Sequence, residues 1–271
     1  CGGLYEKISP SPRCWIYPGS HGSLNVTSAI QHSCNMFFYE VGYRLGLTNQ
    51  MLSNAKSSES GYSSDQGCET LLKYATMFGL DHKSGIEISE NDPKLTTEDP
   101  ERSAMGQGTN SYTNVQLSRY VSALANRGNV YELSLVDKVM TSDGRVVREH
   151  QTELSSQVKV ADSTWDAVQT GMRAVVSEGS AKDIFKDLEV EIAGKTGTAQ
   201  ENSRANHAWF ISYGPYTNPE ISVTVNIPYG YTSSNAAAVA KNVYRLYYGY
   251  TSLDEILNAG ALRASNVVIG D

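Results

Sequence analysis

Five consecutive residues, Gly194-Lys195-Thr196-Gly197-Thr198, combine a cation, two hydroxyls and two glycines within a run that has the pattern of a β-strand. A lysine that projects from a strand places positive charge beside a substrate carboxylate and a reacting centre, and threonine hydroxyls donate hydrogen bonds. Gly197 leaves room for an extended substrate along the strand edge, and a backbone N–H near Thr198 can stabilise an oxyanion. The segment predicts a binding site on a sheet edge beside a serine nucleophile.

The triplet Gly-Lys-Thr also ends phosphate-binding loops, which are therefore an alternative class of site for this segment. A phosphate-binding loop requires a glycine five residues before Gly194, and Glu189 stands there. It also requires a turn from a strand into a helix, whereas a further strand pattern follows these residues. The sequence therefore excludes a phosphate-binding loop.

Ser33-Cys34-Asn35 is a second candidate group, 162 residues before Lys195 and at the junction of two predicted helices. A serine hydroxyl there can relay a proton, and an asparagine amide can hydrogen-bond a substrate amide. The alternative is that Ser33 and Asn35 only cap the second helix, since both residue types are common caps. The Lys-Thr-Gly strand favours the catalytic interpretation over the capping one.

Helical segments must position the serine group. Apolar residues between Val26 and Leu45 have helical spacing, but the polar run 31–35 interrupts them and predicts two helices joined by a short turn. Residues 1–24 read as a loop and residues 48–67 as a mobile surface loop. Further predicted elements before residue 180 are a helix over 71–78 ending at Gly79, a helix from Thr113 stopped by Gly128, a hairpin over 135–149 turning at Asp143-Gly144, and a helix capped by Ser163.

The last third of the sequence predicts the sheet that carries Lys195. Strand-like runs cover Val190–Ala199, Ala208–Tyr213 and Ile221–Ile227, and a helix over Asn235–Tyr248 stops at Gly249. Helices followed by an antiparallel meander backed by a helix indicate an α+β fold.

Composition excludes several classes of function. The net charge is −7 and no segment is rich in Lys and Arg, so we do not expect nucleic acid as a partner. The longest purely apolar run, Ala236–Ala240, is far shorter than the roughly 20 residues of a bilayer span. Because the sequence starts without Met and without the pattern of a signal peptide, we expect Cys1 to follow a cut or a boundary.

Four cysteines are too few for a disulfide scaffold. Cys1 and Cys14 flank a loop rich in Ser and Pro and either form a disulfide outside the cytoplasm or stay as thiols. A metal site that joins them to His21 is a third alternative, but no pair of these ligands has a standard spacing. We therefore expect no metal site and no cofactor.

The order of several motifs resembles the transpeptidase domain of class B penicillin-binding proteins. The resemblance extends to about Tyr248, so we expect a partial transpeptidase domain over 1–250, with helices at about 25–180, strands at about 188–228 and a final helix at about 235–248, and a tail over 251–271. The matching motifs are Cys14-Trp15, His21-Gly22, Ala29-Ile30, Ser33–Tyr39, Tyr74-Ala75, Phe78-Gly79-Leu80, Ser84-Gly85-Ile86, Gly106-Gln107-Gly108, Gln116-Leu117, Ala193–Gln200 and His207–Phe210.

The resemblance implies a β-lactamase/transpeptidase-like antiparallel sheet flanked by helices, incomplete at its N-terminus. It also implies a peptidoglycan D,D-transpeptidase that penicillins acylate. Ser33, Asn35 and Lys195 would be catalytic, and Thr196, Gly197 and Thr198 would bind substrate. Implied partners are stem peptides, β-lactams and a glycan-polymerising membrane protein. The implied location is the outer face of the cytoplasmic membrane, through a tether in a missing N-terminal segment.

One departure from the family concerns the nucleophile. The family places the serine of a Ser-x-x-Lys motif on a helix roughly fifty residues before Ser-x-Asn, whereas 32 residues precede Ser33. Ser53/Lys56 lies in a loop after Ser33, and Ser156/Lys159 lies in a strand-like alternation, so we interpret both strings as accidental. We therefore expect the nucleophile to be absent and this chain alone to be inactive.

Alternative functions share the same motifs. A D,D-carboxypeptidase or a β-lactamase would transfer the acyl group to water, and a non-enzymatic penicillin sensor or scaffold would use the domain for binding. We interpret His207 as structural, although it could act as a general base. Gly106-Gln107-Gly108 is predicted to form a tight turn before a helix, or else to bring the backbone to the site.

Overall fold

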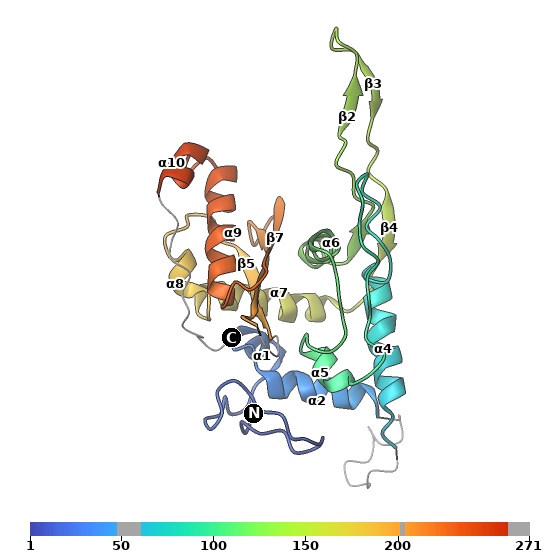
Figure 1. The fold of residues 1–271 in the computed structure, drawn as a ribbon, viewed down its shortest axis with the longest axis vertical. Coiled ribbons are helices and arrows are strands. Elements are labelled where there is room, and N and C mark those ends of the chain that lie inside the picture. The colour runs from blue at the N-terminus through green and yellow to red at the C-terminus, as the bar shows by residue number, and fades with distance from the viewer. Residues whose placement is uncertain (48–60, 201–203, 260–271) are drawn as a thin grey trace.

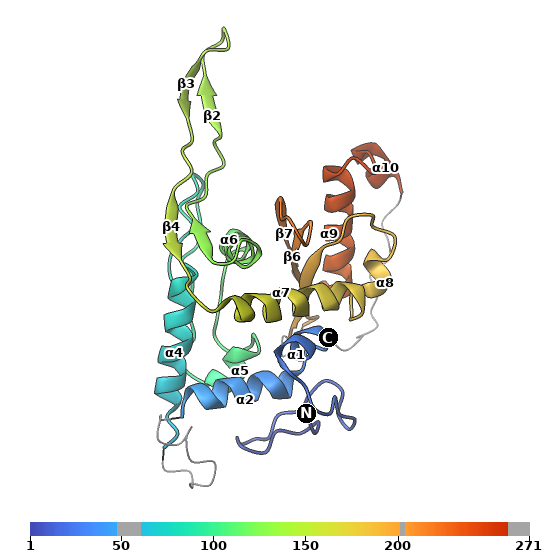
Figure 2. The same ribbon diagram turned by 180° about the vertical axis from the view of Figure 1, so that it is seen from behind.

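A computed structural model describes residues 1–47, 61–200 and 204–259. A three-stranded sheet lies between helices on both faces, a second group of helices stands beside it, and a hairpin projects from the body (Figures 1 and 2). The helices are α1 (Val26–Gln31), α2 (Asn35–Leu45), α4 (Ser64–Met77), α5 (Pro100–Ala104), α6 (Asn114–Ala125), α7 (Asp162–Ser177), α8 (Lys182–Phe185), α9 (Ser233–Tyr247) and α10 (Leu253–Asn258). The strands are β1 (Asn129–Tyr131), β2 (Lys138–Met140), β3 (Val146–Glu149), β4 (Leu154–Gln157), β5 (Ala193–Ala199), β6 (His207–Gly214) and β7 (Ile221–Ile227).

The central sheet has the order β5-β6-β7, with both pairs antiparallel. Its register places Gly197 opposite Trp209 and Phe210 opposite Val225. The predicted α+β arrangement, with an antiparallel meander backed by a helix, is confirmed. Within the described residues the sheet is not closed, because β5 and β7 each have one neighbouring strand. Completion of the sheet by strands upstream of this chain stays a prediction.

The core lies on both faces of this sheet. Helix α9 packs on one face, and α6 and α7 cover the other. Phe210 is fully buried, which stabilises the fold by about 1.5–3 kcal/mol relative to exposure of the ring. Tyr244 on α9 is also buried; its hydroxyl donates to Ser212 Oγ at 2.9 Å, and Ser212 Oγ donates to the Val223 carbonyl at 3.2 Å. These bonds pair hydroxyls that would otherwise be costly to bury.

Several local predictions agree with the structure and others are wrong. Two helices do replace the single run 26–45, Gly79 (φ 69°) does follow α4, and Gly144 (φ 86°) does turn the β2–β3 hairpin. The predicted loop 48–67 is wrong at residues 64–67, which begin α4, and its residues 48–60 lie outside the described residues. Within the expected tail, residues 253–258 form α10.

Two predicted helix ends are misplaced. Helix α7 begins at Asp162 after Ala161, and its N-cap makes no side-chain hydrogen bond, so Ser163 is not the cap. The Ala161 carbonyl instead accepts from Thr164 N at 2.9 Å. Helix α6 ends at Ala125, and Arg127 (φ 62°) takes the left-handed position one residue before Gly128.

The first predicted strand also starts too early. β5 begins at Ala193 rather than Val190, because the backbone before it bonds elsewhere. The Glu191 carbonyl accepts from Tyr216 N at 2.7 Å, and the Ile192 carbonyl accepts from Arg173 Nη1 at 3.3 Å. The small sheet that pairs β1 with β4 was not predicted. Among the described residues, no helix is both long and apolar enough to cross a bilayer.

Helices α2 and α5 approach each other closely at Gly42, and this contact gives the first testable prediction. A Cβ added at Gly42 would lie 2.3 Å from the Pro100 carbonyl oxygen and 2.6 Å from Glu101 Cα. Helix propensity alone favours Ala over Gly by about 1 kcal/mol. We expect Gly42→Ala to lower the free energy of unfolding by about 1–3 kcal/mol instead, because backbone atoms must move apart.

Urea denaturation of the two proteins measures this difference. Gly2→Ala is the matched control, since nothing lies within 4 Å of a Cβ at Gly2. A Gly42→Ala protein that unfolds at higher urea than the parent would show that the α2–α5 contact is looser than described.

Candidate functional site

Ser33 lies at the C-terminal end of α1 in a left-handed backbone conformation, with φ 49°. The Cys34 N–H donates to the Ala29 carbonyl at 3.0 Å, and the Ser33 N–H donates to the Ile30 carbonyl at 3.1 Å. This pair of bonds is the Schellman motif, whose left-handed position glycine usually occupies. A serine here costs about 1–2 kcal/mol relative to glycine, so the fold holds its side chain in place against a local preference.

Asn35 begins α2, and Cys34 is the N-cap of that helix. The Cys34 side chain makes no capping hydrogen bond, and neither Ser33 nor Asn35 occupies the cap position. The capping interpretation of these two residues is therefore wrong. Both side chains line a cleft instead.

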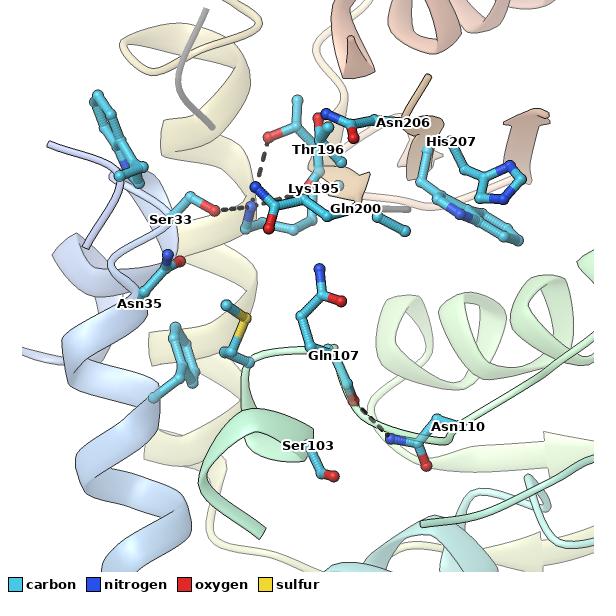
Figure 3. Close-up of a pocket in the computed structure, with 18 of the residues that line it drawn as sticks. Ser33, Asn35, Ser103, Gln107, Asn110, Lys195, Thr196, Gln200, Asn206 and His207 are labelled. Carbon is cyan, nitrogen blue, oxygen red and sulfur yellow. Dashed lines mark hydrogen bonds between the residues drawn. The ribbon is translucent and has the colours of Figure 1, made fainter. Parts of the chain in front are cut away.

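Lys195 extends from β5 to the turn between α1 and α2 (Figure 3). Its Nζ donates to Ser33 Oγ at 2.8 Å and to the Thr196 carbonyl at 2.8 Å. Thr196 Oγ1 lies 3.4 Å from the same Nζ, and the Ser180 hydroxyl lies 3.1 Å from Thr196 Oγ1. The structure thus brings together two groups that are 162 residues apart in sequence.

The cleft around this contact has a volume of about 1180 Å³. Residues 195–200 of β5 and its continuation line one wall, and Asn35 and Phe38 of α2 line another. Gln107 enters from the loop after α5, with its side chain directed toward Lys195 and Gln200 (Figure 3).

Tight packing fixes the β5 wall. A Cβ at Gly194 would meet the Phe210 ring at 2.6 Å, and one at Gly197 would meet Trp209 Cβ at 3.3 Å. Thr198 Oγ1 accepts from the Ser233 N–H at 3.3 Å, at the start of α9. Glycine at 197 thus relieves crowding within the sheet, and its role in leaving the strand edge open for a substrate stays a prediction.

Other residues singled out in the sequence have different positions. His207 lines the cleft at the start of β6, and its Nδ1 accepts from the Tyr229 N–H at 3.3 Å, which agrees with a structural interpretation. Ser156 lies on β4 and donates to the Met77 carbonyl at 3.1 Å, away from the cleft-lining residues. Ser53 and Lys56 lie outside the described residues.

Sequence reasoning missed the side chains of Gln107 and Ser180. Gly106 (φ 96°) and Gly108 (φ 90°) flank Gln107, and two flexible glycines around one polar residue are the signal that could have revealed it. Ser180 has no comparable signal, because its contact with Thr196 depends on how α7 packs against β5.

The N-terminal loop contributes a cluster that was only partly predicted. Cys1, Cys14 and His21 do lie together, and Cys34 joins them. The four cysteines of the chain, including Cys68, carry free thiols in the structure, so the disulfide between Cys1 and Cys14 is not formed.

Comparison with known proteins adds the family. Residues 6–245 match the family model for the penicillin binding protein transpeptidase domain. The chain is 28% identical over 284 residues to peptidoglycan D,D-transpeptidase MrdA of Haemophilus influenzae, a match covering 87% of this chain and 40% of that protein. The chain therefore spans about two fifths of the length of this relative.

Solved structures agree with the fold. The crystal structure of Pseudomonas aeruginosa PBP2 in complex with WCK 5153 superposes with a TM-score of 0.72 at 26% identity, covering 90% of this chain and 52% of that one. A structure described as a peptidoglycan synthase complex that coordinates polymerization and crosslinking has a TM-score of 0.72 at 23% identity, covering 96% and 42%. The predicted β-lactamase/transpeptidase-like fold is confirmed.

The left-handed backbone at Ser33 predicts a difference between two substitutions that remove the same hydroxyl. Both Ser33→Ala and Ser33→Gly lose the hydrogen bond from Lys195. Glycine adopts the left-handed conformation without a steric penalty, so Ser33→Gly should be more stable than Ser33→Ala by about 1 kcal/mol. Differential scanning calorimetry should show a melting midpoint about 2–4 °C higher for Ser33→Gly. Equal midpoints, or a higher one for Ser33→Ala, would contradict the described turn.

Proposed function

Because the chain belongs to the penicillin-binding protein transpeptidase domain family, we propose that the protein carrying it is a peptidoglycan D,D-transpeptidase. The observation that carries the proposal is the hydrogen bond between Lys195 Nζ and Ser33 Oγ, beside the open edge of β5. It couples a cation on a strand to a hydroxyl on a helical turn at one point of a cleft. That arrangement suits acyl transfer, in which a proton must reach a leaving amine while an oxyanion is stabilised.

The proposed reaction has two acyl transfers. A serine attacks the carbonyl of the penultimate D-Ala, the C–N bond to the last D-Ala breaks, and an acyl-enzyme forms. An amine of a second stem peptide then attacks that ester and releases the serine. Lys195 donates to Ser33 Oγ, so the Ser33 hydroxyl proton points elsewhere and can pass to the leaving nitrogen, while Ser33 Oγ takes up the proton that the attacking serine gives up. Ser33 is thus the proposed proton relay and Lys195 the group that orients it.

The remaining site residues have proposed binding roles. Thr196 and Thr198 offer hydroxyls, and Lys195 offers positive charge, for the terminal carboxylate of a D-Ala-D-Ala end. The edge of β5, which has no strand beside it among the described residues, offers backbone groups to an extended peptide, which would add to the sheet as a further strand. Asn35 faces the cleft from α2, where its amide can bond the peptide backbone.

The nucleophile is proposed to come from another part of the protein. Among the described residues, the only serine with a lysine three positions later is Ser156, which lies on a strand outside the cleft-lining set. Such a pair needs a helix to place both groups on one face. We therefore propose that the described residues form no acyl-enzyme by themselves.

A hydrolytic function is the main rival, because carboxypeptidases and β-lactamases share these motifs. One observation favours synthesis, since the relative named above is a D,D-transpeptidase.

Partners and location follow as proposals. We assign β-lactams as inhibitors that acylate the same serine, and a glycan-polymerising membrane protein as the partner of the complete protein. The peptidoglycan synthase complex that superposes on this chain supports that partner. The proposed location is the outer face of the cytoplasmic membrane, where cross-linking takes place, with the tether in another segment.

The proposal predicts a cross-linked product and a specific role for Asn35. The complete protein, given a donor peptide ending in D-Ala-D-Ala and an amine acceptor, should release D-Ala and form the joined peptide. Asn35→Ala should slow this about tenfold, because one hydrogen bond to the substrate is lost, while Asn258→Ala on α10 should not. Mass spectrometry of the products measures both. Release of D-Ala with only hydrolysed peptide would replace the transpeptidase with a carboxypeptidase.

A further inference from the structure

Arg13 lines the cleft from the N-terminal loop of residues 1–24. Ser33 and Lys195 line the same cleft from the turn after α1 and from β5. The loop runs beside α1 and α2 in both views of the chain (Figures 1 and 2). Lys195 is the cation proposed for the terminal carboxylate of the donor peptide. Arg13 is therefore a second cation in this cleft, and the proposed function gives it no role.

The backbone is held in place on both sides of Arg13. On one side, the Tyr5 N–H donates to the Pro12 carbonyl at 3.0 Å. On the other side, the Cys14 N–H donates to the Gly3 carbonyl at 2.8 Å. These two bonds make Arg13 part of an antiparallel bridge within the loop, so the start of its side chain has a defined position.

Trp15 connects the same loop to the turn that carries the proposed proton relay. Its Nε1 donates to the His32 carbonyl at 3.1 Å, one residue before Ser33. Arg13 is two residues from this anchor, which fixes the loop relative to the reacting end of the cleft. A group on a backbone that is already ordered loses little entropy when it contacts a substrate, so it is well placed for recognition.

An aromatic ring orients the guanidinium group of Arg13. The Cζ atom lies over the Tyr17 ring, 4.6 Å from its centre. Such a contact uses the flat face of the guanidinium, whereas the five N–H donors lie in its plane and stay available. Arg13 is exposed and forms no ion pair within the part of the chain that the structure describes. Its positive charge is thus not neutralised there by a carboxylate.

The charge of the cleft lining favours an anion. Among the described residues that line it, Arg13 and Lys195 are cationic and none is Asp or Glu. This contrasts with the chain as a whole, which has 29 acidic residues and a net charge of −7. A cleft lined by charges of one sign raises the local concentration of substrates of the opposite sign. Two cations in one cleft suit a substrate with two separate anionic groups.

We infer that Arg13 binds a second carboxylate of a stem peptide, upstream of its D-Ala-D-Ala end. The inference rests on the proposed function and specifies the substrate as a peptide with at least two carboxylates. The guanidinium would donate two parallel N–H bonds to the two carboxylate oxygens, a geometry that a lysine cannot reproduce. The donor and the acceptor are both stem peptides, so either of them can supply this carboxylate.

Peptides that differ only in charge test this role in the complete protein. The donor and the acceptor are each prepared with their upstream carboxylates free or converted to carboxamides, and formation of the joined peptide is measured. For the peptide that contacts Arg13, the acid form should have a kcat/KM about three- to tenfold above that of the amide form, mainly through a lower KM. Arg13→Ala should lower kcat/KM for the acid form to about the value for the amide form. The peptide that shows this preference, donor or acceptor, is the occupant.

Two further variants separate recognition from support of the loop. Arg13→Lys keeps the charge without the paired donors, so it should keep part of the preference. Arg148→Ala is the matched control, because Arg148 is an exposed arginine on β3 outside the cleft lining, and it should keep the full preference.

The outcomes that contradict the inference are distinct from failure of the proposed function. If Arg13→Ala slowed the acid and amide forms equally, Arg13 would only support the loop, and the carboxylate role would be wrong. An acid-to-amide ratio that Arg13→Ala leaves unchanged for both peptides would also overturn it. Absence of D-Ala release from every donor would instead overturn the proposed function, and this inference with it.

Discussion

The structure depends on one contact across the chain, the hydrogen bond between Lys195 on β5 and Ser33 on the turn after α1. Neither β5 nor the turn after α1 fixes the position of the other through this hydrogen bond alone. Helix α7 is the link, because α1 packs on it and it packs on β5. A Cβ at Gly171 of α7 would lie 2.9 Å from Ile30 Cβ, so α1 and α7 meet without an intervening side chain, and Thr27 Oγ1 donates to the Ala167 carbonyl at 3.1 Å. The stack α1–α7–β5 therefore sets the distance between hydroxyl and ammonium.

Both residues of this contact are held in a conformation or an environment that costs free energy locally. Ser33 occupies a backbone position that suits glycine, and the Lys195 ammonium is half-buried. Such costs persist only where surrounding packing determines the geometry, which is common at catalytic sites. The core supplies that packing here, through buried Phe210 on β6, buried Tyr244 on α9 and the small alanines of α9.

Sequence alone predicts what local pattern and motif order determine. The strands around Lys195, the turn at Gly144 and the break between α1 and α2 follow from alternation, turn residues and a polar interruption. The cap of α7 could not be predicted from Ser163, because a backbone bond to the Ala161 carbonyl competes with the side-chain cap. Ser180 acquires its contact with Thr196 only through tertiary packing. Contacts between residues that are far apart in the sequence leave no pattern within a short stretch of it.

The central claim is that Ser33 and Lys195 act as one unit in acyl transfer, and a double-mutant cycle tests it most directly. Acylation rates of the complete protein with a fluorescent penicillin would be measured for Ser33→Ala, Lys195→Met and the pair. If the two residues act through their shared hydrogen bond, the double variant should be about as slow as the slower single variant, because the second substitution removes nothing further. Losses that multiply would mean that the two residues act independently, and would contradict the account.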